Sequence, residues 1–434
     1  MTNRVGVNET RSARAASGSA DRPDFVIAMR AGGARPWRTY IESWALPYAL
    51  IGAAVSGGVP ILMPLAVARS GSPSAIGFVM ATFNLGSVLA PLCGLLADRY
   101  RWHRVLFAGG ALVTGGAVAA FPWAQNLPAM CGLAFSAGAG SGAAVTMAYL
   151  FVTGTHPRDE WPSRIGAAQL LYVSGQIVGL LAASTVAWVG IRACFAINGL
   201  VALVATVPAW RTARLPSRSV HPIPGPRLVR PRLVWHHLRS PFALFLAMWT
   251  LALTGSQMFY TVYPVFMARI FRVTPGESSF VYALVVGLSL FLFTPVCTWT
   301  NRLGASPMIQ IALMTRTTSL LAIAALGYLV GPPGARCAEI AFATLQFAWS
   351  ILSVSSAACA AHLSPLGEGE GMGFYNAAAA IGGVAGAMIG GVVAALWGYA
   401  VVPGVGAASI LCALLLNRHL MLQGGARPPS REAA

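Results

Sequence analysis

The stretch GLLADRYRWHR, residues 94–104, is the most informative segment of this sequence. It concentrates charge between two long apolar segments, although charged residues make up only 9% of the chain. A fainter copy, NRLG at residues 301–304, follows another apolar segment, and its Asn and Arg lie 203 positions after Asp98 and Arg99 (301 − 98 and 302 − 99). Polar turns that recur at about half the chain length predict two related modules in tandem.

The rest of the sequence is too apolar for a soluble protein. Hydrophobic residues form 56% of the 434 residues. Charged residues form 9%, whereas soluble domains carry about 25%. The apolar segments are about 20 residues long, the length that crosses a bilayer as a helix. We therefore expect an all-α integral membrane protein with twelve spans, at 44–68, 74–96, 104–124, 129–153, 164–189, 191–210, 242–268, 278–300, 307–330, 337–362, 372–395 and 399–417.

The net charge of +17 predicts topology rather than nucleic-acid binding, which would need the basic residues on one folded face. All 29 basic residues are Arg, and 23 of them fall in segments on one side if the N-terminus is cytoplasmic. Five fall on the other side, and Arg316 lies within a span. The positive-inside rule then places both termini in the cytoplasm. An Arg-only, Ala- and Gly-rich composition favours a bacterial cytoplasmic (inner) membrane, crossed many times.

Hydrophilic stretches divide the chain into five parts. The polar ends are interpreted as disordered cytoplasmic tails, and a Pro- and Arg-rich stretch in the centre as a solvated cytoplasmic linker. The expected organisation is a tail at 1–40, an N-terminal six-helix bundle at 41–210, the linker at 211–240, a C-terminal six-helix bundle at 241–418 and a tail at 419–434.

A second set of positions supports the duplication. Four small or amide residues of the fifth span recur in the eleventh at a constant offset of 207: Gly166, Gln169, Gly175 and Gly179 against Gly373, Asn376, Gly382 and Gly386. This predicts two pseudo-symmetric six-helix bundles, related by an axis along the membrane normal, that turn about a site between them.

Gly94, Asp98 and Arg99 at these spacings resemble the signature loop between the second and third helices of the major facilitator superfamily of secondary transporters. The resemblance implies alternating access and a latch, in which Asp98 holds the cytoplasmic side closed against a helix of the other half. Where the family has a second Gly this chain has Tyr100 followed by Arg101, and Leu180 replaces the Pro of the exporter motif. The gating candidates are Gly94, Asp98, Arg99, Arg101, Arg104, Asn301 and Arg302.

The resemblance also implies a central cavity lined by spans one, four, seven and ten, with help from two, five, eight and eleven. Buried amides and hydroxyls in lipid are costly unless they face a partner, a cavity or a ligand. The alternative for each is an interhelical hydrogen bond or plain packing. The cavity candidates are Asn84, Tyr149, Gln169, Tyr172, Gln176, Gln257, Tyr260, Tyr263, Gln346, Trp349, Tyr375 and Asn376.

Two kinds of charge are candidates for binding and coupling. Arg316 lies about ten residues into span nine and is a candidate anion contact; the alternative is pairing with carbonyls or reaching toward the cytoplasmic interface. The predicted spans hold no acidic residue near their middle, so Glu42, at the cytoplasmic mouth of span one, is the first candidate for proton coupling, and Asp98 the second.

An uncharged, aromatic cavity suits small hydrophobic or amphipathic organic compounds, and we expect efflux by analogy with bacterial exporters. The alternatives are uptake or exchange of a metabolite or organic anion, and a non-transporting receptor on the same scaffold. Enzyme chemistry is not expected, since no paired acids or nucleophile sets are present. No metal or cofactor is expected, and the partners would be a small-molecule substrate, protons and the lipid bilayer around a monomer.

Overall fold

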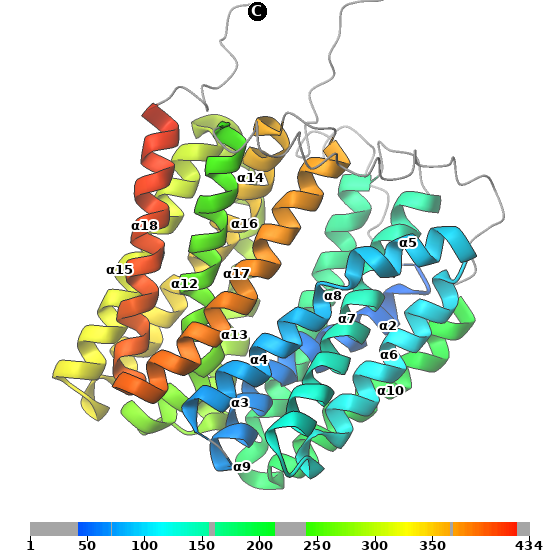
Figure 1. The fold of residues 1–434 in the computed structure, drawn as a ribbon, viewed down its shortest axis with the longest axis horizontal. Helices are drawn as coiled ribbons and strands as arrows, with labels where there is room; N and C mark the ends of the chain where they lie inside the picture. Colours follow the sequence, from blue (N-terminus) through cyan, green and yellow to red (C-terminus); the bar gives the residue numbers. More distant parts are fainter. Residues whose placement is uncertain (1–41, 71, 156–160, 213–239, 365–367, 423–434) are drawn as a thin grey trace, which may run out of the picture.

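The computed structural model describes residues 42–70, 72–155, 161–212, 240–364 and 368–422 (Figure 1). The tail expected at 1–40 and nearly all of the linker expected at 211–240 lie outside these residues. The tail expected from residue 419 begins inside the last helix, which continues to Leu422.

The N-terminal half contains six spans, and several of them are built from consecutive helical pieces. These are α2 (Ala45–Gly52), the π-helix η2 (Ala53–Gly58) and α3 (Val59–Ser70); α4 (Pro73–Ser87) and α5 (Ala90–Tyr100); α6 (His103–Ala120) and η3 (Phe121–Trp123); α7 (Leu127–Thr155); α8 (Trp161–Ser184) and α9 (Val186–Val189); and α10 (Ile191–Thr212).

The C-terminal half repeats this order. Its elements are α12 (Pro241–Ile270); α13 (Pro275–Ser289), η5 (Leu290–Leu292) and α14 (Phe293–Leu303); α15 (Ala305–Leu329); η6 (Pro332–Gly334) and α16 (Ala335–Leu363); α17 (Glu368–Trp397); and η7 (Tyr399–Val401) with α18 (Val402–Leu422). Twelve helices of the described chain are long and apolar enough to cross a membrane, which confirms the predicted fold class.

Local sequence signals account for several of the helix starts. Ser240 and Thr274 each precede a proline that occupies the first helical turn, where a missing N–H costs nothing. The Ser240 hydroxyl accepts a hydrogen bond from the N–H of Ala243, and the Thr274 hydroxyl from the N–H of Glu277, both at 3.2 Å. These N-caps fix where α12 and α13 begin.

The duplication appears in the packing as well as in the sequence. In the N-terminal half, α8 lies so close to the first span that a Cβ added to Gly179 would sit 1.9 Å from the carbonyl oxygen of Ala53. In the C-terminal half, a Cβ on Gly386 of α17 would sit 2.4 Å from the carbonyl oxygen of Thr254 on α12. Each half therefore packs its fifth span against its first through glycine.

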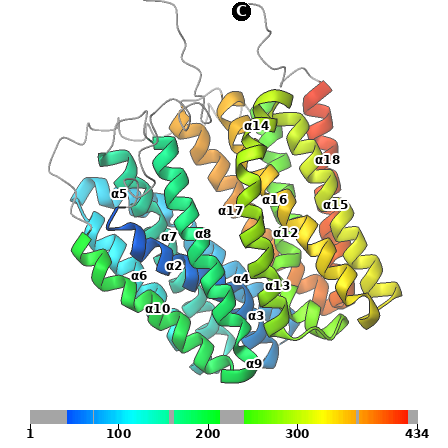
Figure 2. The same ribbon diagram turned by 180° about the vertical axis from the view of Figure 1, so that it is seen from behind.

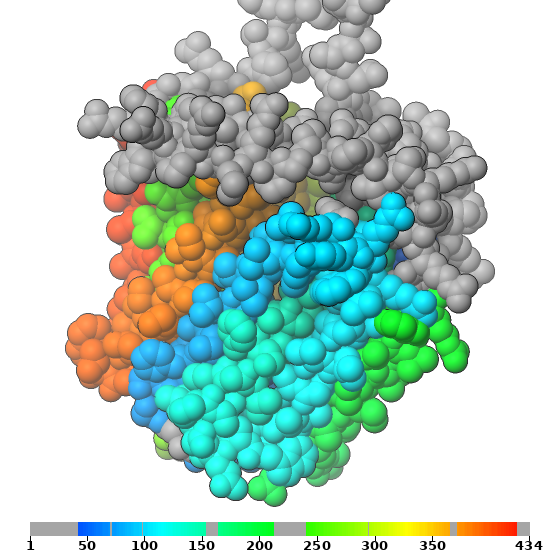
Figure 3. Space-filling model, turned by 45° about the vertical axis from the view of Figure 1, so that its right-hand side comes forward, coloured from blue at the N-terminus to red at the C-terminus, as the bar shows by residue number. Residues whose placement is uncertain are grey.

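The two halves meet through α4 against α17 and α8 against α13 (Figures 1 and 2). Figure 3 shows the blue surface of α4 lying against the orange surface of α17. The contact is closest near the start of α4 and the end of α17, where a Cβ on Gly391 would lie 2.6 Å from the Cα of Gly77. Nearer the middle, the Asn84 amide donates a hydrogen bond to the Gly383 carbonyl at 3.2 Å.

The close contact between Gly77 and Gly391 lies on one side of the bundle. We call the side on which α18 ends at Leu422 the terminal side, or the side of the chain end, and it is at the top of the view in Figure 1. The start of α4 and the end of α17 lie on the opposite side, so that is where the halves pack backbone to backbone.

Candidate functional site

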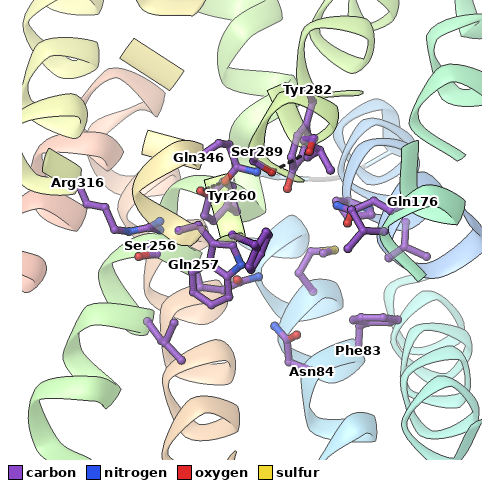
Figure 4. A pocket seen from close by; sticks show the side chains of 18 residues that line it. Phe83, Asn84, Gln176, Ser256, Gln257, Tyr260, Tyr282, Ser289, Arg316 and Gln346 are labelled. Atoms are coloured by element: carbon purple, nitrogen blue, oxygen red, sulfur yellow. Dashed lines mark hydrogen bonds between the residues drawn. The ribbon is translucent and has the colours of Figure 1, made fainter. Parts of the chain in front are cut away.

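A cavity of about 300 Å³ lies between the two halves, near the middle of the spans (Figure 4). The N-terminal half contributes α3, α4 and α8, and the C-terminal half contributes α12, α13, α14, α15 and α16. The residues that line it are Val59, Pro60, Met80, Phe83, Asn84, Val173, Gln176, Leu253, Ser256, Gln257, Tyr260, Tyr282, Val286, Ser289, Phe293, Arg316, Gln346 and Trp349.

Polar groups are distributed unequally over the cavity wall. The N-terminal half contributes two amides, Asn84 and Gln176, in an otherwise apolar surface. The C-terminal half contributes hydroxyls, amides, an indole and a guanidinium: Ser256, Gln257, Tyr260, Tyr282, Ser289, Arg316, Gln346 and Trp349. A small molecule in the cavity would find most of its hydrogen-bonding partners on the C-terminal half.

Tyr260 and Gln346 form a connected pair in this wall. The Tyr260 hydroxyl on α12 donates a hydrogen bond to the side-chain oxygen of Gln346 on α16. This hydrogen bond orients both side chains. Because it uses the side-chain oxygen of Gln346, the amide nitrogen of Gln346 remains to donate to a neighbour or a ligand.

Arg316 reaches the cavity from α15, behind α12 and α16. Its side chain is fully buried, and Nη1 donates a hydrogen bond to the carbonyl oxygen of Leu345 at 3.1 Å. The guanidinium carbon lies 5.8 Å from the ring centroid of Tyr260 and 5.7 Å from that of Trp349. Figure 4 shows the side chain entering on the side opposite Gln176.

Half of the predicted cavity residues lie together in this lining: Asn84, Gln176, Gln257, Tyr260, Gln346 and Trp349. A second predicted group, outside the lining, lies within the N-terminal half. There the Gln169 amide donates to the Tyr149 hydroxyl, and the Tyr172 hydroxyl is 2.8 Å from that of Ser56. Tyr172 lies about one helical turn from Gln176, so this group continues the polar path from the cavity toward the terminal side.

The other three predicted residues lie elsewhere in the C-terminal half. The Tyr263 hydroxyl donates to the Ser278 carbonyl at 3.3 Å, and its ring stacks on Phe342. The Tyr375 hydroxyl is 2.9 Å from that of Ser356. Asn376 is exposed on α17. The two tyrosines therefore join helices of one bundle.

Eleven of the 18 lining residues were not among the sequence candidates, and Phe83, Ser256, Tyr282 and Ser289 are four of them. Tyr282 carries a hydroxyl in a span already expected to line the path, so the rule that selected the other tyrosines could have found it. The two serines give no such signal, because a serine hydroxyl in a membrane helix can satisfy itself on its own backbone, as Ser256 does on Ala252 at 2.6 Å.

The charged loop after span two has a backbone feature that repeats in the second half. α5 ends at Tyr100, and Arg101 adopts a left-handed conformation with φ of 57°. Gly304, 203 positions later (304 − 101), also has positive φ, at 93°. The C-terminal copy thus has a glycine, Gly304, at the position of Arg101. Glycine adopts a positive φ without strain, whereas arginine does not.

The side chains of this loop lie mostly at the surface. Arg99 lies over the ring of Tyr100 at 5.6 Å, and Arg104 over that of Trp210 at 4.1 Å. Asn301 and Arg302 are exposed, and Gly94 is partly buried. The side chain of Asp98 lies outside the described structure, so the latch remains a prediction.

Replacing Arg101 by glycine is expected to stabilise the protein by about 1 kcal/mol, because the left-handed conformation costs about that much for a residue with a Cβ. The measurement is thermal unfolding of the purified protein in detergent. Arg99→Gly, inside α5, is the matched control and should lower the melting temperature. A lower melting temperature for Arg101→Gly would contradict the prediction.

Glu42 lies just before the first span and is paired. Its Oε1 is 3.1 Å from Nη1 of Arg164 at the beginning of span five, and its Oε2 accepts a hydrogen bond from the Trp44 indole at 2.9 Å. The pair therefore ties the terminal-side ends of spans one and five. Within the described residues, no three His, Cys, Asp or Glu side chains come together as a metal site.

Comparisons with known proteins agree with this architecture. The model of the Major Facilitator Superfamily matches residues 46–368. A crystal structure of the nucleoside transporter NupG has a TM-score of 0.73 at 11% identity, covering 87% of this chain and 98% of that one. A bacterial homolog to the human lysosomal transporter Spinster, in an inward-facing and occupied conformation, has a TM-score of 0.69 at 13% identity, covering 92% and 100%.

The crystal structure of a D-xylose-proton symporter is also similar, with a TM-score of 0.67 at 14% identity over 86% of this chain and 95% of that one. No curated protein sequence is a significant match to the chain. At these identities the structures establish the fold, whereas the family model spans most of the sequence. Together with the twelve spans, this shows that the chain is a multi-pass membrane protein of the major facilitator superfamily.

Proposed function

We propose that this protein is a secondary active transporter that moves small amphipathic organic compounds by alternating access. The observation that carries the proposal is the cavity of about 300 Å³ between the two halves, at mid-depth of the spans. Its volume is at the lower end of the range for small-molecule sites, and its wall combines aromatic and apolar side chains with a few amides and hydroxyls.

The packing between the halves supports the alternating-access part of the proposal. The interface on the side opposite the end of α18 includes a close backbone contact between two glycines, Gly77 and Gly391. Such contacts have no interlocked side chains to disengage, so the bundles can separate there and meet on the terminal side.

We propose that the terminal side is cytoplasmic, because the positive-inside bias of the arginines favours that orientation. The described conformation would then face the cytoplasm. We propose export as the direction, on the grounds of the acid-free, aromatic lining of this cavity and an analogy to bacterial drug and metabolite exporters. Faster energised uptake of the substrate into inverted than into right-side-out membrane vesicles would support export, and the reverse would contradict it.

The transport proposal can be tested with the purified protein in proteoliposomes. We expect counterflow of a labelled neutral amphipathic probe, 2-naphthamide, above that of protein-free liposomes. Gln176→Ala should reduce the rate about fivefold by removing a cavity amide worth about 1 kcal/mol. Ser174→Ala, on the exposed face of the same helix, should stay within twofold, since its hydroxyl bonds the Leu170 carbonyl.

A receptor on the same scaffold would give a different result. It would bind probes without moving them, so saturable binding with no flux of any amphipathic compound would overturn the transport proposal.

For coupling, we propose that Glu42 carries the proton. Glu42→Gln should remove the dependence of transport on an imposed pH gradient while leaving counterflow intact. The matched control is Glu277→Gln, because Glu277 is also ion-paired, at 2.7 Å from Arg336, but at the start of α13 on the opposite side. Transport by Glu42→Gln that still responds to the pH gradient would remove Glu42 from this role.

A further inference from the structure

The side chain of Arg316 has an incomplete set of partners. It is 0% exposed, and Nη1 donates a hydrogen bond to the Leu345 carbonyl. Nε and Nη2 are both buried without a partner. No carboxylate of the described residues lies within ion-pairing distance of it. A buried cation with two unused donors is costly, so its presence at this depth needs an explanation.

The two unused donors lie on one edge of the guanidinium. Nε–H and the adjacent N–H of Nη2 point in parallel, and this fork can donate one hydrogen bond to each oxygen of a carboxylate. The Nη1 bond to α16 uses the other side and holds the group in orientation. The two unsatisfied donors, Nε and Nη2, therefore have the geometry that binds a carboxylate.

The surroundings of Arg316 belong to the transport cavity. Arg316 lines the cavity together with Ser256, Gln257, Tyr260 and Trp349 (Figure 4). The faces of the Tyr260 and Trp349 rings lie near the cation and stabilise it in part. They also cover it, so a ligand oxygen has to displace a ring to reach the guanidinium, and Trp349, at 37% exposed, is the more exposed of the two rings.

We propose that the substrate is a small organic monocarboxylate with an apolar or aromatic body, and that Arg316 binds its carboxylate through Nε and Nη2. This rests on the proposed transport function and specifies its substrate class. Among the described residues that line the cavity, Arg316 alone is charged, so they offer one positive charge for one negative charge. The apolar wall of the N-terminal half receives the body of the molecule.

Three matched acid and amide pairs test the proposal: benzoate and benzamide, 2-naphthoate and 2-naphthamide, and indole-3-acetate and indole-3-acetamide. Dissociation constants are measured by equilibrium dialysis with the full-length protein in detergent at neutral pH. At least one acid should bind about 10- to 100-fold more tightly than its own amide, as expected for charge-assisted hydrogen bonds. Arg316→Gln should bring that acid to within about threefold of its amide, with the amide affinity nearly unchanged.

Arg418→Gln is the matched control, because Arg418 is exposed on α18; the preference for the acid should remain. If Arg316→Gln does not fold, Arg316→Lys keeps the charge but removes the fork, and should lower the preference about tenfold. The proposal is overturned if none of the acids is preferred by the unmodified protein or if the preference survives in Arg316→Gln. It is also overturned if Arg316→Lys leaves the preference undiminished, or if Arg418→Gln removes it as Arg316→Gln does.

The outcome is separable from that of the transport proposal. Binding that depends on Arg316, without flux of any compound, would support the carboxylate site and reject transport. Flux of 2-naphthamide with no acid preference in binding would support transport and reject the carboxylate site.

Discussion

Replacing Gly391 by leucine is expected to block transport by preventing the halves from closing on the side opposite the chain end. A Cβ at this position would lie 2.6 Å from the Cα and 2.7 Å from the nitrogen of Gly77, both backbone atoms that cannot rotate away. Overpacking of this kind costs about 3 kcal/mol, enough to reduce the population of the described conformation about 100-fold. The fold of each half should survive, because the strain is relieved when the halves separate.

The matched control is Gly373→Leu, on the same helix α17, where an added Cβ has no atom within 4 Å. Counterflow should fall about 100-fold in Gly391→Leu and by less than threefold in Gly373→Leu. Conformation is read from maleimide labelling of Met80→Cys, a cavity position, in a background without the native cysteines. Labelling should shift to the side opposite the chain end; unchanged labelling and transport in Gly391→Leu would contradict the prediction.

Replacing Gly175 by leucine should have a different and larger effect, the loss of a folded N-terminal half. An added Cβ would lie 1.9 Å from the carbonyl oxygen and 2.7 Å from the carbonyl carbon of Ala49. This contact lies within one bundle, between α8 and α2, so no functional movement relieves it. We expect destabilisation by about 3 kcal/mol or more, since both helices would have to move apart and give up their packing.

The measurements are the yield of monodisperse protein in detergent and its melting temperature. Gly116→Leu on α6 is the control, because Gly116 has open space around its Cα. If the Gly175→Leu protein has the same melting temperature as the Gly116→Leu protein, α8 and α2 do not pack as described.

The sequence predicted the fold well because membrane topology depends on long-range regularities that one chain displays. The spans expected at 104–124 and 191–210 lie within one residue of the helices that run from His103 to Trp123 and from Ile191 to Arg211. The offset of 203 between the two polar loops reappears in the backbone, where Arg101 and Gly304 both have positive φ. Such signals need no knowledge of how a helix is rotated.

The cavity was harder to predict because helix rotation decides it. In a membrane, the lipid-facing and core-facing sides of a helix are both apolar, so the pattern that orients a soluble helix is weak. Tyr260 and Tyr263 lie on the same helix, yet Tyr260 lines the cavity and Tyr263 bonds to Ser278 inside its own bundle. Arg316 shows the same difficulty: its depth was evident, but not that its side chain would cross to the cavity.

The π-helical segment Ala53–Gly58 in the first span has a further mechanical consequence. A turn wound with i→i+5 bonds holds surplus chain, and rewinding it to i→i+4 would twist the two flanking pieces against each other by about 100° per residue released. One flank carries Tyr48, and the other carries Val59 and Pro60 of the cavity wall. The first span could therefore act as a torsional joint: a rotation of its Tyr48 end would turn the cavity wall at Val59 and Pro60 without any tilt of the bundle.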